Sequence, residues 1–206
     1  SRKHNYQGIV LTSWSTSGIY GFEWDAFYEP IAMHPIRRVY PLKGFNILLA
    51  AFNKALSHDE IFDPKSFVID YVKKHFGLSD KNSTHFYNSL MANPSPVYVP
   101  KTELSKPVKE VLPGVKKANL LLKKIKPTKN KVDFEHFRLM GALRENYLHF
   151  KHVEASLESA SYKDKDRLTL MRKLKVLLKN ETGLSKQFSN LMKGYLQPQE
   201  IQTENE

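Results

Sequence analysis

The sequence of 206 residues contains no cysteine. Disulfide bridges, thiolate metal sites and a cysteine nucleophile are therefore excluded. Long apolar runs are also missing, and no stretch approaches the roughly 18 apolar residues that a membrane-spanning helix needs. Glycine and proline, with 9 and 11 residues, are too scarce for a low-complexity chain. With 41% hydrophobic and 26% charged residues, the composition is that of an ordinary globular protein with a buried core.

Signature motifs of catalysis and phosphate binding are absent as well. The sequence has no G-x-x-x-x-G-K-[ST] or G-x-G-x-x-G loop, no H-E-x-x-H zinc motif and no G-x-S-x-G nucleophile elbow. Glu145, His149 and His152 place metal-ligand types at helical spacing, but a surface pair or a helix-packing pair is the stronger interpretation. No metal and no cofactor are therefore expected.

Positive charge is concentrated in the second half of the chain. The net charge is +11, and nine lysines but a single acid, Glu110, lie between Lys106 and Lys131. One interpretation is a solvated helix face; the other is a binding surface for a polyanion or a partner protein. The second interpretation assigns polyanion binding to four residues: Lys116, Lys117, Lys123 and Lys124. Nucleic acid is the less favoured polyanion, because the run contains no arginine to read bases and no aromatic residue to stack on them.

The first half combines one short apolar run with an aromatic-rich segment. Residues 8–12 are apolar and β-branched, which predicts a buried strand. Residues 19–30 then interleave aromatic side chains with three acids. Carboxylates that move protons and aromatic faces that stack on sugar rings are typical of carbohydrate chemistry, with Tyr20, Glu23 and Trp24 as candidate binding residues. The alternative is that these aromatics form a core and that the acids cap helices or pair with arginines.

Helical patterns follow along the rest of the chain. Apolar spacing predicts helices over 44–56 and 83–91, and Asp63-Pro64 with Gly77 predicts another over 64–76. Three longer apolar stripes predict further helices. Pro107 and Pro113-Gly114 interrupt the first stripe, which predicts a short piece followed by a helix from about Gly114. The other two stripes predict helices over 137–157 and over 168–195. The turns between these helices are short, which predicts an up-down-up arrangement. Pro198 is expected to end the last helix, leaving 199–206 as a frayed tail.

We therefore predict a mainly α protein with a short N-terminal β segment, further helices and a C-terminal antiparallel three-helix bundle. The proline-rich break at 93–100 predicts a boundary between residues 1–99 and residues 100–206.

The run from Gly8 to Gly18, Gly-Ile-Val-Leu-Thr-Ser-Trp-Ser-Thr-Ser-Gly, resembles the last barrel strand and following loop of glycoside hydrolase family 20. The later layout is similar to the hexosaminidase D-like branch, in which helices and a long helical region follow the barrel. The resemblance implies that residues 8–60 are the closing strand and helix of a barrel, a barrel-end remnant, and that 100–206 are the appended bundle. It also implies that Trp14 walls the pocket of an N-acetylglucosamine ring.

The resemblance further implies a function that this chain does not complete alone. The family uses the substrate's own acetamido oxygen, oriented by an Asp next to an acid/base Glu. The only adjacent Asp-Glu here is Asp59-Glu60, in a polar segment, and a barrel of about 250 residues does not fit. We therefore expect a C-terminal portion or remnant of a hydrolase acting on N-acetylhexosaminides, inactive alone and reaching carbohydrate through the complete enzyme. Packing against the missing barrel, or self-association, is expected as well. The alternative is a non-catalytic basic helical binding module.

Overall fold

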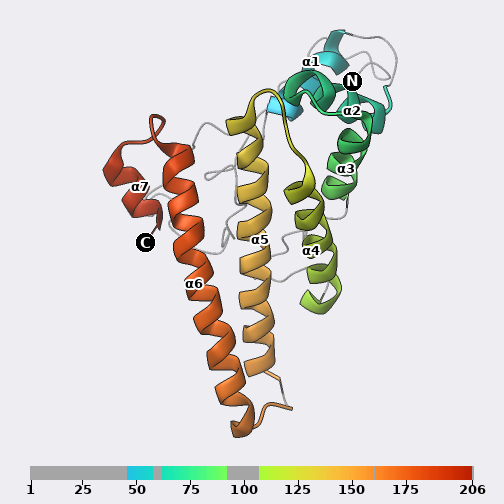
Figure 1. Ribbon diagram of the computed structural model, residues 1–206. Helices are drawn as coiled ribbons and strands as arrows, with labels where there is room; N and C mark the ends of the chain where they lie inside the picture. Colours follow the sequence, from blue (N-terminus) through green and yellow to red (C-terminus); the bar gives the residue numbers. More distant parts are fainter. Residues whose placement is uncertain (1–45, 58–61, 92–106, 160, 206) are drawn as a thin grey trace.

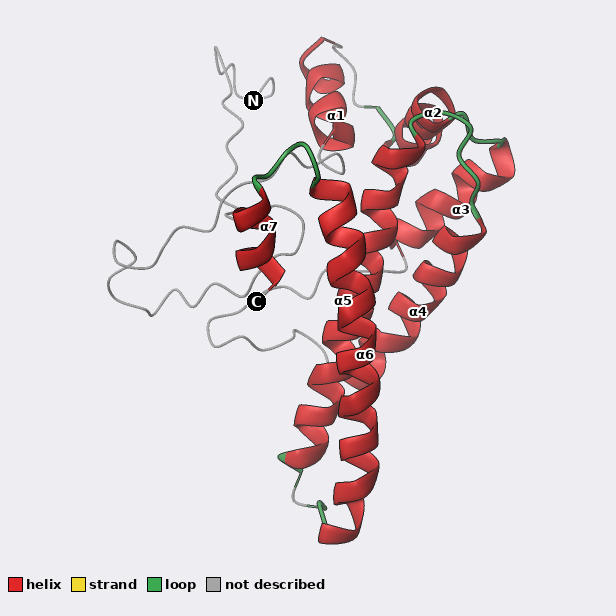
Figure 2. Ribbon diagram, turned by 60° about the vertical axis from the view of Figure 1, so that its left-hand side comes forward, coloured by secondary structure: helices red, strands yellow, loops and turns green. Residues whose placement is uncertain are grey.

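The computed structural model describes residues 46–57, 62–91, 107–159 and 161–205. Within these ranges the chain is almost entirely helical and forms no β-strand (Figures 1 and 2). The predicted mainly α class is therefore confirmed. The strand expected at residues 8–12 lies outside the described residues.

The described residues form helices of different lengths. They are α1 (Asn46–Ser57), α2 (Pro64–Phe76), α3 (Asp80–Met91), α4 (Val108–Lys124), α5 (Lys131–Leu157), α6 (Arg167–Met192) and α7 (Pro198–Asn205). One 3-10 turn, Asp164–Asp166, precedes α6.

Local sequence signals set both ends of α2 where they were predicted. Asp63 has an extended backbone, and its carboxylate accepts a hydrogen bond of 2.8 Å from the backbone N–H of Ser66. The same carboxylate accepts from the Ser66 hydroxyl, and these bonds lower the pKa of Asp63. At the other end Gly77 takes φ 63°, the left-handed conformation that a side chain disfavours.

The structure corrects the prediction for α4. We expected Pro113 to interrupt the stripe and the helix to start near Gly114, but α4 is continuous from Val108. Pro113 is exposed, whereas buried apolar residues on both sides of it, Leu112 and Val115, lie on the same helix. Packing of both flanks against α5 outweighs the single backbone hydrogen bond that the proline removes.

The end of the chain also differs from the prediction. Pro198 does not terminate the helical region; it begins α7, where its fixed φ suits the first turn. The Glu200 carboxylate accepts a hydrogen bond of 2.8 Å from the backbone N–H of Gln197, which caps this start. Ile201 packs against the cluster that contains Met192 of α6, so residues 198–205 form a docked helix rather than a frayed tail.

The three long helices run antiparallel, as predicted. Figure 1 shows α5 in the middle, with α4 on one side and α6 on the other, and both outer helices pack against it. The shorter helices α1, α2 and α3 gather around the end where α5 begins, and α7 lies beside the end of α6.

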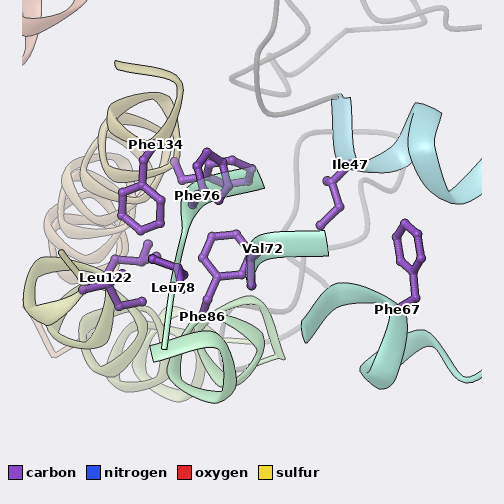
Figure 3. Packing of buried hydrophobic residues seen from close by; sticks show 10 residues of the cluster. Ile47, Phe67, Val72, Phe76, Leu78, Phe86, Leu122 and Phe134 are labelled. Carbon is purple, nitrogen blue, oxygen red and sulfur yellow. The ribbon is translucent and has the colours of Figure 1, made fainter. Parts of the chain in front are cut away.

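The largest core cluster lies where the short helices meet the beginning of α5. It is rich in phenylalanine, and Figure 3 shows Phe76, Phe86 and Phe134 together beside Leu122. The Phe76 and Phe134 rings meet edge to face at 5.2 Å between centroids. This cluster takes residues from both sides of the boundary predicted at 93–100, a segment outside the described residues.

Candidate functional site

The sugar-binding residues predicted from the sequence all lie outside the described residues. Trp14, Tyr20, Glu23 and Trp24 belong to residues 1–45, so their role stays a prediction. The lysines predicted to bind a polyanion lie on α4, and the site is built from that helix and its neighbours.

The four α4 lysines are all exposed to solvent and form two rows along the helix. Lys116 and Lys123 are seven residues apart, as are Lys117 and Lys124, so each pair lies on one side of the helix. The two rows lie about 100° apart around the helix axis. Among the described residues, no acid forms an ion pair with any of these four lysines. Within the described part of the chain, their charges are therefore not neutralised by an ion pair.

A buried polar contact between the two helices holds α4 close to α5. Asn119 is 5% exposed, and its side-chain nitrogen donates to the Gly141 carbonyl at 2.8 Å and to the Glu145 carboxylate at 2.6 Å. A Cβ on residue 141 would lie 2.1 Å from the Asn119 side-chain oxygen, so the approach requires glycine there. The contact holds Glu145 in place on α5, one helical turn before His149.

His149 is the half-buried centre of the site. Its Nε2 lies 3.9 Å from the Glu145 carboxylate, and its side chain is 33% exposed. Burial lowers the pKa of His149, the positive charge of Lys116 lowers it further, and Glu145 acts in the opposite direction. His152 and Lys173 also act to lower it. The imidazole is therefore neutral near pH 7.

Packing contacts bring groups from three helices around His149. Val115 of α4 and Leu148 of α5 belong to one buried cluster, and Lys116 and His149 directly follow them in sequence. Val153, one turn after His149 on α5, is buried in a cluster with Leu170 and Leu177 of α6, and Lys173 lies between these two leucines. We call Lys116, His149, His152 and Lys173 the basic face. No sequence pattern assigns Lys173 to this site, because it is 57 residues from Lys116 and belongs to another helix. The spacing of His149 and His152 indicates only a metal pair or a packing pair, and not a place beside the lysines.

The two outer helices carry the charge of this region, while the central helix is balanced. Residues 167–192 hold six bases and one acid, and residues 108–124 hold five bases and one acid. Residues 131–157 hold four of each. A polyanion that crosses the three helices would meet cations from α4 and α6 with the titratable His149 between them.

The described part of the chain has a surface depression but no cluster of metal ligands. Within the described ranges, no group of three or more histidines and acids, Glu145, His149 and His152 included, is arranged to hold a metal ion. The depression lies on α6 and is lined by Leu178, Glu181, Thr182 and Ser185.

None of the described helices combines the length and the apolar character needed to cross a bilayer. Comparison with protein-family models, with curated proteins and with solved structures finds no significant match to this chain.

Proposed function

We propose that the chain is the C-terminal portion of a family 20-like glycoside hydrolase acting on N-acetylhexosaminides. The observation that carries this proposal is the run from Gly8 to Gly18, with Trp14 placed where the family has the aromatic wall of its sugar pocket. Its mainly helical continuation agrees with the layout of the hexosaminidase D-like branch, in which helices follow the barrel.

The catalytic pair would have to come from other polypeptide. The sequence has one adjacent Asp-Glu, Asp59-Glu60, which lies outside the described residues and follows a predicted helix rather than a barrel strand. The chain would supply a pocket wall and an appended helical region, and it would not transfer a proton to the glycosidic oxygen.

A turnover assay with a chromogenic N-acetylglucosaminide tests this proposal. The isolated chain should show no hydrolysis, and a polypeptide extended upstream to include a full barrel should be active. In the extended protein, Trp14→Ala should lower kcat/KM by about tenfold, the loss expected when an aromatic contact worth roughly 1.4 kcal/mol is removed. Trp14→Phe, which keeps an aromatic face, should lose much less. Robust turnover by the isolated chain, or equal activity of Trp14→Ala, would contradict the proposal.

A second candidate function is a non-catalytic basic module that binds a polyanion, and the exposed lysines of α4 favour it. Changing Lys116, Lys117, Lys123 and Lys124 to Glu should abolish salt-dependent retention on heparin. A control with the same charge change uses four exposed lysines elsewhere: Lys74, Lys81, Lys165 and Lys193. Equal losses from both variants would mean that net charge alone, and not the α4 surface, governs retention.

A further inference from the structure

We propose that the basic face binds an acidic polysaccharide, and that this binding strengthens as the pH falls below neutrality because His149 gains a proton in the complex. The proposal rests on the second candidate function above, and it adds three things: residues on α5 and α6, a ligand class and a regulatory group.

The basic face is built across three helices. The contact of Asn119 with Gly141 and Glu145 sets the position of α4 against α5. Lys116 lies one turn before Asn119 on α4, and His149 lies one turn after Glu145 on α5. Because the two helices are antiparallel, both groups are displaced from the contact toward the same end of the helix pair. Lys116 and His149 directly follow residues that are buried in one cluster of α4 and α5. Lys173 lies on α6 between two leucines that are buried with Val153, which is one turn after His149 on α5. A linear anion would therefore contact α4, α5 and α6 together.

Charged and titratable groups from three helices face His149. They are Lys116 from α4, Glu145 and His152 from α5 itself, and Lys173 from α6. Two lysines oppose protonation of the imidazole, and one carboxylate favours it. An anion bound between Lys116 and Lys173 would offset the charge of these lysines and raise the pKa of His149 from its lowered value. By linkage, a ligand that favours the protonated form binds more tightly as the pH falls.

The side chains of the basic face favour an acidic polysaccharide as the ligand. No aromatic residue lies on α4, and the only aromatic on α6, Phe188, is 5% exposed. Tyr147 of α5 is partly buried against the apolar cluster that α4 and α5 share. The exposed Phe150 follows His149 directly and so lies about 100° away around α5. The face therefore offers point charges without the exposed rings on which single-stranded nucleic acids stack. Sulfate and carboxylate groups spaced along a polysaccharide suit lysine and imidazole cations, and heparin is the probe.

Titration of the full chain with heparin at pH 7.5 and pH 5.5, at one fixed ionic strength, tests the histidine. If heparin raises the pKa of His149 by about one unit, affinity should rise by up to about tenfold between the two pH values. His149→Gln should lose most of the gain in affinity between pH 7.5 and pH 5.5. His85→Gln, on α3, should keep the full gain. Thermal unfolding of each variant will establish that it is folded.

A matched pair on α6 tests the convergence of the helices. Lys173 and Lys175 are both exposed, but a separation of two residues turns them about 200° apart around the helix. Lys173→Glu should weaken heparin binding by about tenfold, and Lys175→Glu should weaken it by much less, although both change the net charge equally.

The outcomes separate this proposal from the function on which it rests. Binding at pH 7.5 that depends on the four α4 lysines but shows no gain at pH 5.5, or a gain that survives His149→Gln, overturns the proposal and leaves the second candidate function standing. Equal effects of Lys173→Glu and Lys175→Glu also overturn it. Duplex DNA that binds as tightly as heparin overturns the polysaccharide assignment. Absence of heparin binding at both pH values contradicts the proposal and the second candidate function together.

Discussion

The phenylalanine-rich end of the molecule and the long stem of α5 and α6 are packed in different ways. Around Phe76, Phe86 and Phe134, aromatic rings from three helices meet with centroids 5.2 to 6.2 Å apart. Towards the far end of the stem, the buried cluster is small and contains Val153, Leu170 and Leu177. Apolar side chains of α6 near this cluster remain exposed: Leu168, Met171, Val176 and Leu178.

The comparison shows that the more extensive packing lies at the aromatic end. Buried side chains of α2, α3, α4 and α5 meet there, so a loss affects several helices at once. The stem joins two helices through a small buried cluster and carries exposed cations of α6. Exposed lysines adjoin both regions, because Lys123 and Lys124 directly follow Leu122 of the aromatic cluster.

The largest expected effect comes from removing one aromatic ring at the packed end. Phe134→Ala should lower the free energy of unfolding by about 3–5 kcal/mol, because the ring is fully buried and contacts three other rings. Leu177→Ala in the stem should cost about 2 kcal/mol, since it is 9% exposed and its cluster is small. Urea unfolding of both variants measures the difference. Equal losses would show that the two regions are packed equally well.

The next effect contrasts two glycines of the long helices. Gly141→Ala should lower the free energy of unfolding by about 1–3 kcal/mol, because the added methyl group would overlap the Asn119 side chain. Gly183→Ala in α6 should raise it by about 0.5–1 kcal/mol, because nothing lies within 4 Å of the new methyl group and alanine favours the helix. Thermal or urea unfolding measures whether each substitution raises or lowers the free energy of unfolding. A stabilising Gly141→Ala would rule out the close approach of α4 and α5.

A smaller loss is expected at the start of α2. Asp63→Ala removes both bonds to Ser66 and should lower the free energy of unfolding by about 1 kcal/mol. Asp63→Asn keeps an oxygen acceptor and should retain most of the stability at neutral pH. If Asp63→Ala unfolds like the wild type, the cap contributes nothing and α2 is held by its buried face alone.

The smallest effect is a pH dependence of stability in the stem. Burial lowers the pKa of His149, so the unfolded chain takes up a proton more readily than the folded one. The contribution of His149 is therefore complete above about pH 6.5, the ordinary value for histidine, and is lost as the pH falls through the lowered folded-state value. The thermal midpoint should fall less between pH 7 and pH 5 in His149→Gln than in the wild type. An identical fall would contradict this placement of His149.

Much of the fold could be predicted because its signals are local. Asp63, Pro64 and Gly77 set the ends of α2 through hydrogen bonds and backbone angles within a few residues. The apolar stripes of α4, α5 and α6 predicted three long helices for the same reason. The errors at Pro113 and Pro198 came from treating proline as a local stop signal, whereas packing against α5 continues α4 and docking beside Met192 holds α7.

The candidate site could be predicted only in part. The α4 lysines stand out in composition, and their exposure follows from their place opposite the apolar stripe. Nothing in the spacing along the chain indicates that Lys173 lies near His149, because that depends on how α6 packs against α5. The sugar-binding prediction for Trp14 concerns residues outside those described, and it remains for the turnover assay to test.

The sequence by itself determined where helices form, which sides of them are apolar and that the second half is strongly basic, because propensity, capping and periodicity act over a few residues. Only the tertiary structure decided which charges meet. Side-by-side packing of antiparallel helices brings Lys116, His149 and Lys173 together, and electrostatic forces depend on distance in space rather than on separation along the chain.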